Sequence, residues 1–354
     1  WEDEDPSGLF DAMRRCRDQI TKVKPYKTGS LGVRPAILAE IFARAPGPHV
    51  SPREARDFIE ANFVPVLVRR NDGKAGFVTA FYEPEVDVRD QRDREWRYPF
   101  YRQPADLVEI TAANRPPDFD PSYAFGRLTT AGVVAYADRR DIDSGCLEGQ
   151  GLEIAWARSR VDVFFAHVQG AVRLVYGDGR VRRITYAAKA GHPFTGIGRH
   201  LADIGEIPLA EVSMASIRRW LAEHPERQDE ILWQNRSYIF FRDAPVDDPT
   251  LGPIAAAKVQ LVPMRSLAVD RLIHTFSSLF YINSSSLTDL SGGKPFRKLM
   301  MALDTGTAIV GPSRGDIFTG SGEEAGNLAG NVKNDADFYL LIPKAAAKEI
   351  LDAR

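Results

Sequence analysis

The stretch MALDTGTAIVGPSRGDIFTGSG, residues 301–322, decides the fold assignment and carries two aspartates twelve positions apart. Between Asp304 and Asp316 lie a small apolar run, 308–310, and a Gly-Pro-Ser-Arg-Gly turn. The run predicts a short buried strand, and the turn predicts the loop that follows it. Asp316 then stands at the start of the next strand, 317–318. A carboxylate held by strands and flanked by glycines is placed to meet a ligand, so Asp316 is the first candidate for chemistry.

The composition is that of an ordinary globular protein. The 354 residues suffice for two domains, with 44% apolar and 27% charged residues. A net charge of -2 and scattered basic pairs argue against a nucleic-acid partner. Two cysteines, Cys16 and Cys146, are too few for a disulfide framework or a zinc cluster, and one bridge between them stays open. No apolar run of about 18 residues predicts a membrane span. The chain begins at Trp1, which leaves a removed leader or anchor open.

Helical and strand-rich segments alternate along the first two thirds of the chain. Amphipathic spacing and end signals, such as Ser51 followed by Pro52, predict helices at 10–22, 51–62, 195–204 and 214–224. The N-terminal helices either pack on a β core or form a lid. Alternating or apolar runs around Gly-rich turns predict two hairpins, one from 63–70 and 76–82 and one from 172–176 and 181–186. Further strands are predicted at 163–168 and 238–241.

The final third, 252–343, consists mostly of short strands and Gly-rich turns. Helices are expected there only at 296–302 and 323–330. Many short strands with frequent turns favour closed barrels over a doubly wound sheet.

Nine segments, in their order and spacing, resemble the lytic murein transglycosylase A family. The resemblance covers the chain from about 77 to 344. It is carried by TAFYEP (79–84), YPFYR (98–102), FFAHVQG (164–170), HPFTGIG (192–198), NRSYIFF (235–241), RSLAVD (265–270), DTGTAI (304–309), RGDIFTG (314–320) and AGNLAG (325–330).

The resemblance implies a mainly β fold with peripheral helices. In that family a double-psi β-barrel is built from the N- and C-terminal parts of the chain, and a groove for the glycan separates it from a smaller inserted β domain. Mapped here, residues 1–101 form the N-terminal helices and the first part of the barrel. Residues 102–241 form the inserted domain. Residues 242–354 form the second part of the barrel, the three-aspartate (3D) domain.

The family's three aspartates match Asp270, Asp304 and Asp316. The resemblance implies that Asp316 is the catalytic acid/base, that Asp304 supports it through hydrogen bonding, and that Asp270 is supporting or structural. Substrate binding is implied for Tyr82, Gln169, Gly170, Gly306 and Arg314. The chain departs from the family's usual residues in the expected groove at Ala171, Val172, Ala190 and Thr307, and substrate preference stays open.

The implied reaction cleaves the β-1,4 bond between N-acetylmuramic acid and N-acetylglucosamine in peptidoglycan. Ordinary glycosidases use two carboxylates. A lytic transglycosylase can use one, which protonates the leaving oxygen and then deprotonates the C6 hydroxyl, so that a 1,6-anhydromuramyl end forms. The histidines show no metal-ligand spacing, and no cofactor or metal is expected. The resemblance implies a periplasmic monomer, anchored to the outer membrane if a leader segment has been removed.

Each assignment has an alternative. Asp316 must carry a raised pKa to act as an acid, so we expect Arg314 to face ligand or solvent. Asp316 is otherwise a turn aspartate, and Asp304 caps the loop after a helix. Tyr82 either stacks on a sugar or fills the core, and Glu83 is a poor second acid. The alternative functions are a non-catalytic peptidoglycan-binding protein and an inverting glycosidase that pairs Asp316 with Asp304.

Overall fold

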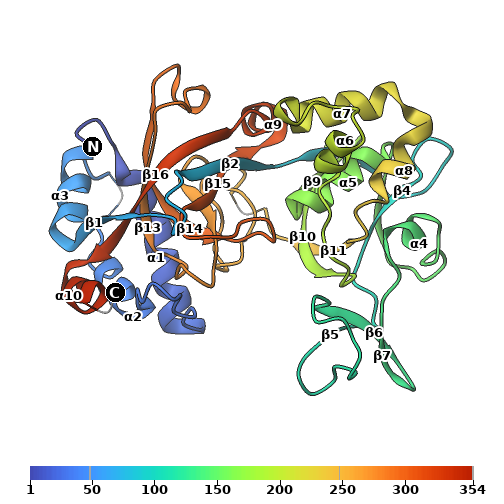
Figure 1. Cartoon of the computed structure of the whole chain (residues 1–354), viewed down its shortest axis with the longest axis horizontal. Coiled ribbons are helices and arrows are strands. Elements are labelled where there is room, and N and C mark those ends of the chain that lie inside the picture. Colours follow the sequence, from blue (N-terminus) through green and yellow to red (C-terminus); the bar gives the residue numbers. More distant parts are fainter. Residues whose placement is uncertain (48, 247, 353–354) are drawn as a thin grey trace. The chain divides into compact units, whose positions relative to one another are not determined.

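The computed structural model describes residues 1–47, 49–246 and 248–352, which form two compact units (Figure 1). Unit 1 consists of Trp1–Tyr82 and Asp248–Arg354, and unit 2 is Glu83–Asp247. The inserted unit therefore begins at 83 and ends at 247, which corrects the predicted limits of 102 and 241. The reason is strand pairing: β3 (Glu85–Arg89) and β4 (Tyr98–Tyr101) both pair with β8 (Glu153–Ala157), and β11 (Ile239–Ala244) extends past 241.

Unit 1 is built on a seven-stranded sheet in the order β1-β16-β13-β14-β12-β15-β2. A further pairing of β16 with β2 closes six of these strands into a ring. The strands are β1 (Phe63–Val68), β2 (Gly76–Glu83), β12 (Ser266–Val269), β13 (Leu279–Ser284), β14 (Phe296–Asp304), β15 (Arg314–Ser321) and β16 (Lys333–Pro343).

The hairpin predicted from β1 and β2 is wrong. The first part of β16 pairs with β2, through Lys333 and Thr79, and its second part pairs with β1, through Pro343 and Phe63. The turn at Gly73 exists, with its N–H donating to the Arg70 carbonyl. A turn signal is local, whereas the partner of each flanking strand is set by packing over the whole barrel.

Two further predictions in the final third are wrong. Residues 296–302 belong to strand β14 rather than to a helix, because an apolar run buried on both faces does not distinguish the two. The run 308–310 is not a strand but part of the loop after β14, with Ile309 buried and Val310 exposed. The helix predicted near 323–330 is confirmed as α9 (Gly322–Gly330).

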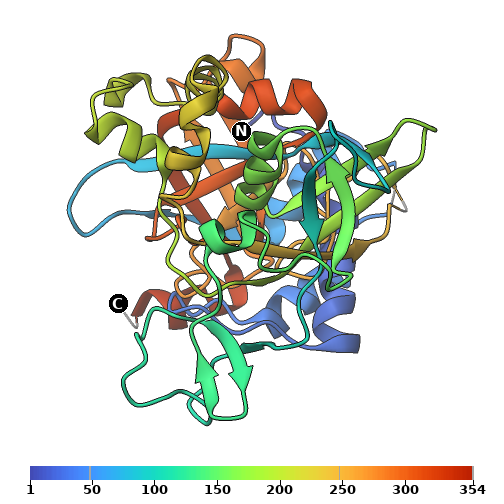
Figure 2. The ribbon, with the colours of Figure 1, turned by 90° about the vertical axis from the view of Figure 1, so that its right-hand side faces the viewer.

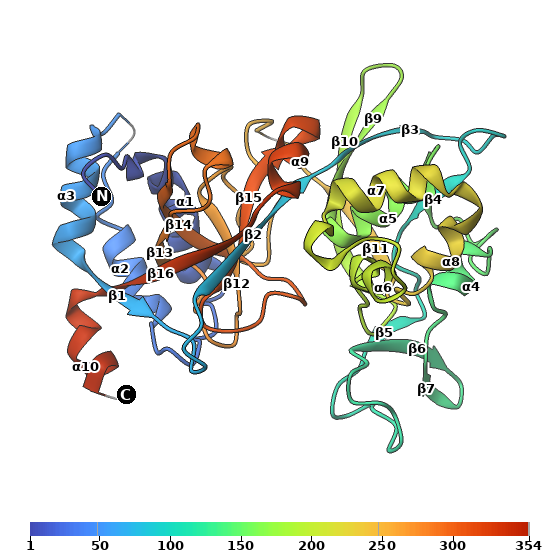
Figure 3. The ribbon, with the colours of Figure 1, turned by 45° about the horizontal axis from the view of Figure 1, so that its top comes forward.

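The N-terminal helices pack on the β core of unit 1. Leu9, Met13 and Phe42 lie in the same buried cluster as the barrel residues Phe280 and Met300. Besides α9, the helices of this unit are α1 (Phe10–Asp18), α2 (Pro35–Phe42), α3 (Pro52–Asn62) and α10 (Ala347–Asp352). Short 3-10 helices occur at Pro6–Leu9, Asp289–Ser291 and Lys344–Ala346, and α1 continues into a π-helical segment, Gln19–Val23. Figures 1 and 3 show α2, α3 and α10 gathered at one end of the unit.

Unit 2 contains a six-stranded sheet in the order β11-β10-β9-β3-β8-β4 and a separate three-stranded sheet. The small sheet lies at one end of the unit (Figure 2), and its Leu107 shares a buried cluster with Tyr101 and Phe240 of the large sheet. Its strands are β5 (Leu107–Glu109), β6 (Phe125–Thr129) and β7 (Gly132–Val134). The predicted hairpin 172–186 is confirmed as the antiparallel pair β9 (Ala171–Tyr176) and β10 (Val181–Lys189).

The helices α5 (Arg160–Gln169), α6 (Ile197–Asp203), α7 (Met214–Glu223) and α8 (Gln228–Leu232) of unit 2 share one buried cluster. The unit also contains α4 (Arg139–Asp143), whose Ile142 lies in a different buried cluster, and short 3-10 helices at Leu209–Glu211 and Pro225–Arg227. The predicted strand 163–168 is wrong because it lies within α5. Ser159 caps the start of α5 and Gly170, in the left-handed region with φ 76°, ends it.

Cys16 and Cys146 are both free thiols, and Cys16 is buried beside Met301 with 3.8 Å between the sulfurs. The bridge that the sequence left open is therefore absent. Across the residues that the structure describes, we find no helix that combines the length and apolar character needed to cross a bilayer.

Candidate active site

Asp304 and Asp316 lie on either side of the same residue of unit 1. Ala268 of β12 pairs with Asp304 of β14 on one side and with Asp316 of β15 on the other. Neighbouring strands are about 4.8 Å apart, so the two aspartate Cα atoms are about 10 Å apart across the sheet. Asp304 ends a strand, and the alternative that it caps a loop after a helix is wrong. Asp316 lies within β15, which also rules out a turn aspartate.

The Thr79 hydroxyl holds the Asp316 carboxyl, and the Arg314 guanidinium in turn bonds to that hydroxyl. Thr79 of β2 donates its hydroxyl hydrogen to Asp316 Oδ1, and Arg314 Nη2 donates to the Thr79 oxygen at 2.7 Å. Arg314 also donates to the carbonyl of Gly315, and its guanidinium lies 5.4 Å from the centre of the Phe77 ring. The expectation that Arg314 turns to ligand or solvent is therefore wrong, because its head group bonds back toward the carboxyl.

The pKa of Asp316 is the balance of opposing effects. Burial raises it above the ordinary value, whereas the Thr79 hydrogen bond and the Arg314 charge lower it, and the net direction is upward. A carboxyl in this setting can hold a proton at higher pH than an exposed aspartate. The same two partners stabilise the ionised form once the proton has left.

Asp304 has a raised pKa for a related reason. Burial raises the pKa of Asp304 to about 6, and the charge of Asp316 adds to the rise. Backbone N–H groups oppose it, with Ala256 donating to Asp304 Oδ1 at 3.2 Å and Thr305 also donating. Asp304 and Asp316 therefore interact through charge, and Asp304 accepts hydrogen bonds from the backbone N–H groups of Ala256 and Thr305.

Asp270 ties two loops together. It follows β12, and its Oδ1 accepts from the N–H of Leu272 at 3.0 Å while its Oδ2 accepts from the N–H of Gly311 at 2.9 Å. These bonds link the loop after β12 to the loop before β15. The exposed side chains of Leu272 and Val310 stand on these two loops. The geometry favours a structural role for Asp270.

The other residues assigned to substrate binding lie in both units. Gly306 is exposed in the loop after β14. Tyr82 is 8% exposed, and its ring lies where a Cβ on Gly326 of α9 would come within 2.7 Å, so the packing alternative is favoured for it. Gln169 and Gly170 belong to unit 2, at the C-terminal end of α5, where Gly170 accepts from the Tyr186 N–H at 2.8 Å.

Glu83 is held in a buried ion-pair cluster rather than presented as an acid. Its carboxylate is 1% exposed and accepts from Arg183 Nε and Nη2 and from Arg173 Nε, the last two at 2.9 Å. All three side chains belong to unit 2, where Arg173 lies on β9 and Arg183 on β10. The low expectation for Glu83 as a second acid agrees with this geometry.

Thr79 is the site residue that sequence reasoning missed. It opens the quoted segment TAFYEP, so the segment was noticed, but its hydroxyl gave no sign of contact with a carboxyl 237 positions away. Only the pairing of β2 beside β15 brings the two together.

Two family descriptions match the chain. The MltA specific insert domain matches residues 77–242, and the 3D domain matches residues 265–342. Among characterised proteins, the membrane-bound lytic murein transglycosylase A of Escherichia coli K12 is 34% identical over 266 residues, which are 73% of this chain. The chain spans 63% of the length of that relative.

Solved structures agree over nearly the whole chain. A membrane-bound lytic murein transglycosylase from Agrobacterium tumefaciens is 57% identical, with a TM-score of 0.93 over 99% of this chain and 96% of that one. MltA from Neisseria gonorrhoeae is 30% identical, with a TM-score of 0.77 over 97% and 89%. E. coli MltA with bound chitohexaose is 27% identical, with a TM-score of 0.69 over 96% and 90%. This chain therefore belongs to the membrane-bound lytic murein transglycosylase A (MltA) family, with its insert and 3D domains.

Proposed function

We propose that this protein is a lytic transglycosylase that cleaves the β-1,4 bond between N-acetylmuramic acid and N-acetylglucosamine in peptidoglycan. The observation that carries the proposal is the half-buried Asp316 carboxyl, whose pKa is raised, which accepts from the Arg314-bound Thr79 hydroxyl, and which lies across β12 from Asp304. Membership in the MltA family supports the substrate class, as does the chitohexaose bound to the E. coli relative.

In this proposal Asp316 works alone as acid and then as base. Protonated Asp316 gives its proton to the oxygen that leaves C1 of the muramic acid, and the C1–O bond breaks. The resulting carboxylate then takes the proton of the C6 hydroxyl, whose oxygen closes on C1 to form the 1,6-anhydro ring. Burial favours the protonated form needed first, and bound glycan would bury the carboxyl further. The Thr79 and Arg314 partners favour the carboxylate needed second.

Asp304 has a charge role in the proposal. With a pKa of about 6 it is mainly ionised at neutral pH, and its negative charge is separated from Asp316 by strand β12, on the far side of Ala268. That charge stabilises positive charge at C1 and opposes early loss of the Asp316 proton. Asp270 acts by holding the loop after β12 to the loop that contains Gly311.

The finer assignments form part of the same proposal. The closed ring of six strands in unit 1 is proposed to be a double-psi β-barrel. Gly306 from unit 1, and Gln169 and Gly170 from unit 2, are proposed to contact the glycan, whereas Tyr82 packs on α9 and the Arg314 head group bonds to Thr79. We further propose that the enzyme acts as a monomer in the periplasm, at the outer membrane. The groove expected between the two parts stays a prediction.

The test is digestion of purified sacculi, followed by mass spectrometry of the released sugar ends. The wild-type protein is expected to give 1,6-anhydromuramyl ends, and Asp316→Asn is expected to give none while keeping its fold by circular dichroism. Asp335→Asn, an exposed aspartate on β16, is the matched control and should cleave normally. Binding to sacculi without released fragments would replace the proposal with a glycan-binding protein, and reducing ends would replace it with a hydrolase.

A further inference from the structure

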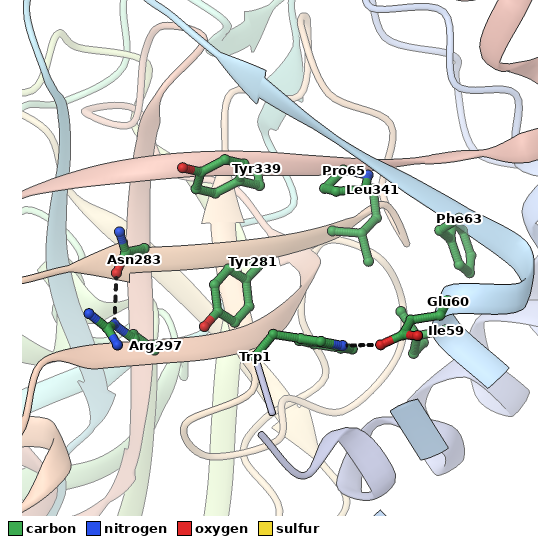
Figure 4. A pocket seen from close by; sticks show the side chains of 10 residues that line it. All are labelled: Trp1, Ile59, Glu60, Phe63, Pro65, Tyr281, Asn283, Arg297, Tyr339 and Leu341. Atoms are coloured by element: carbon green, nitrogen blue, oxygen red, sulfur yellow. Dashed lines mark hydrogen bonds between the residues drawn. The ribbon is translucent and has the colours of Figure 1, made fainter. Parts of the chain in front are cut away.

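Unit 1 contains a cavity of about 460 Å³ that lies apart from the aspartates (Figure 4). It opens on the face of β16, β13 and β14 that is turned away from the barrel core. Along β13, Phe280 and Ile282 are core residues, and Tyr281 and Asn283 alternate with them onto this face. The lining residues are Trp1, Ile59, Glu60, Phe63, Pro65, Tyr281, Asn283, Arg297, Tyr339 and Leu341, which we call the aromatic pocket.

Three rings that combine an apolar face with a polar group line the aromatic pocket. Tyr281 and Tyr339 are direct partners on neighbouring strands, with ring centres 6.3 Å apart. Trp1 meets Tyr281 edge to face at 5.7 Å, and its indole N–H donates to the Glu60 carboxylate on α3. The buried Glu4 holds the segment behind Trp1, because it accepts from the Leu299 N–H at 2.9 Å. The rings are therefore fixed by a sheet and a tethered segment.

Polar groups stand at both ends of the row of rings. At one end Arg297 donates through Nε to Asn283 Oδ1 at 3.2 Å, and the exposed guanidinium has further N–H groups that can donate. At the other end is the exposed carboxylate of Glu60. Figure 4 shows the Arg297 and Asn283 pair on one side, Glu60 on the other, and Tyr281 and Tyr339 between them.

We propose that the aromatic pocket is a second glycan site, which binds a short β-1,4-linked N-acetylhexosamine segment. A sugar ring presents an apolar C–H face that packs on an aromatic ring and a rim of hydroxyl and amide groups that need donors and acceptors. The rings of the aromatic pocket match the apolar C–H face of the sugar. The Arg297 guanidinium and the Glu60 carboxylate match its hydroxyl and amide groups. An acyl chain would match the rings but would leave the carboxylate and the guanidinium unused. The choice of glycan rests on the proposed function.

The aromatic pocket cannot be a part of the aspartate site. Arg297 precedes Asp304 by seven positions on β14, which at about 3.3 Å per residue corresponds to about 23 Å of strand. A glycan chain bound in the aromatic pocket would stay near the enzyme between cleavages, because a second point of contact raises the effective concentration of the glycan.

The test measures the ¹⁹F NMR signal of Trp1, which lines the aromatic pocket. The other four tryptophans, at 96, 156, 220 and 233, all belong to unit 2, so the ¹⁹F resonance of Trp1 in 5-fluorotryptophan protein reports on the aromatic pocket once Trp1→Phe has assigned it. The probe is N,N′,N″-triacetylchitotriose, titrated into the Asp316→Asn protein so that no cleavage occurs. We expect the Trp1 resonance to shift to saturation.

Variants decide the assignment. Tyr339→Ala should weaken the Trp1 titration at least about tenfold, and the exposed Arg297→Ala, which does not endanger folding, should weaken it about fivefold. Leu209→Ala, an exposed apolar residue of unit 2, should leave it unchanged. A Trp1 resonance that does not move with the trisaccharide, that moves equally in all variants, or that responds only to decanoate would overturn the proposal. These outcomes are independent of the sugar ends released from sacculi, which test the proposed function.

Discussion

Replacing Asp304 by asparagine is expected to stabilise the protein above neutral pH, although it lowers activity. Burial raises the Asp304 pKa from 3.8 to about 6. At about 1.4 kcal/mol per pKa unit, this rise corresponds to about 3 kcal/mol. The folded protein holds this proton more tightly than the unfolded chain does, so its stability falls as the pH rises from about 4 through 6. Asparagine never ionises, and it keeps an oxygen that can accept from the Ala256 N–H.

The measurement is urea unfolding of the wild type and Asp304→Asn from pH 4 to pH 8. The difference in the free energy of unfolding should be near zero at pH 4 and should grow to about 3 kcal/mol in favour of the variant at pH 8. Asp335→Asn, which removes an exposed carboxylate from β16 of the same unit, should show no such growth. A difference that does not change with pH, or a variant that is less stable at pH 8, would refute the assignment of a buried, costly charge to Asp304.

Two further predictions concern Thr79 and Glu83. Thr79→Val removes a hydrogen bond that lowers the Asp316 pKa, so that pKa should rise and the high-pH limb of kcat/KM should move to higher pH; a limb that stays in place would mean that it does not report on Asp316. Glu83→Gln removes the buried counter-charge of Arg173 and Arg183. It should lower the free energy of unfolding, measured by thermal unfolding, by about 3–5 kcal/mol. The control Glu85→Gln, an exposed residue 3.6 Å from Arg173, should cost less than about 1 kcal/mol, and equal losses would contradict the burial argument.

Segments whose structure is fixed by local signals could be predicted from the sequence. Ser51 forms a capping box with Glu54 at the start of α3, and the Gly177-Asp178-Gly179 turn joins β9 to β10, as the residues indicate. Apolar runs were ambiguous: the run in β14 was predicted as a helix and that in α5 as a strand, although Ser159 and Gly170 carry the end signals of a helix.

Contacts between distant strands could not be predicted in the same way. β2 was given β1 as its partner, yet it lies between β15 and β16, and this placement is what delivers Thr79 to Asp316. The same contact draws Arg314 back toward the carboxyl, against the expectation that it would face outward. The resemblance to the family was enough to identify the aspartates. It could not identify the partners that set their pKa values, because those contacts depend on the closed ring of strands.

The central claim, that Asp316 transfers protons while the sugar's own C6 hydroxyl closes on C1, is tested most directly by digesting sacculi in water enriched in ¹⁸O. A reaction that consumes no water should leave the new muramyl ends free of ¹⁸O and lighter by one water than reducing ends. Asp316→Asn should remove this product without changing the fold. Incorporation of ¹⁸O at the newly formed ends, or unchanged release by Asp316→Asn, would contradict the account.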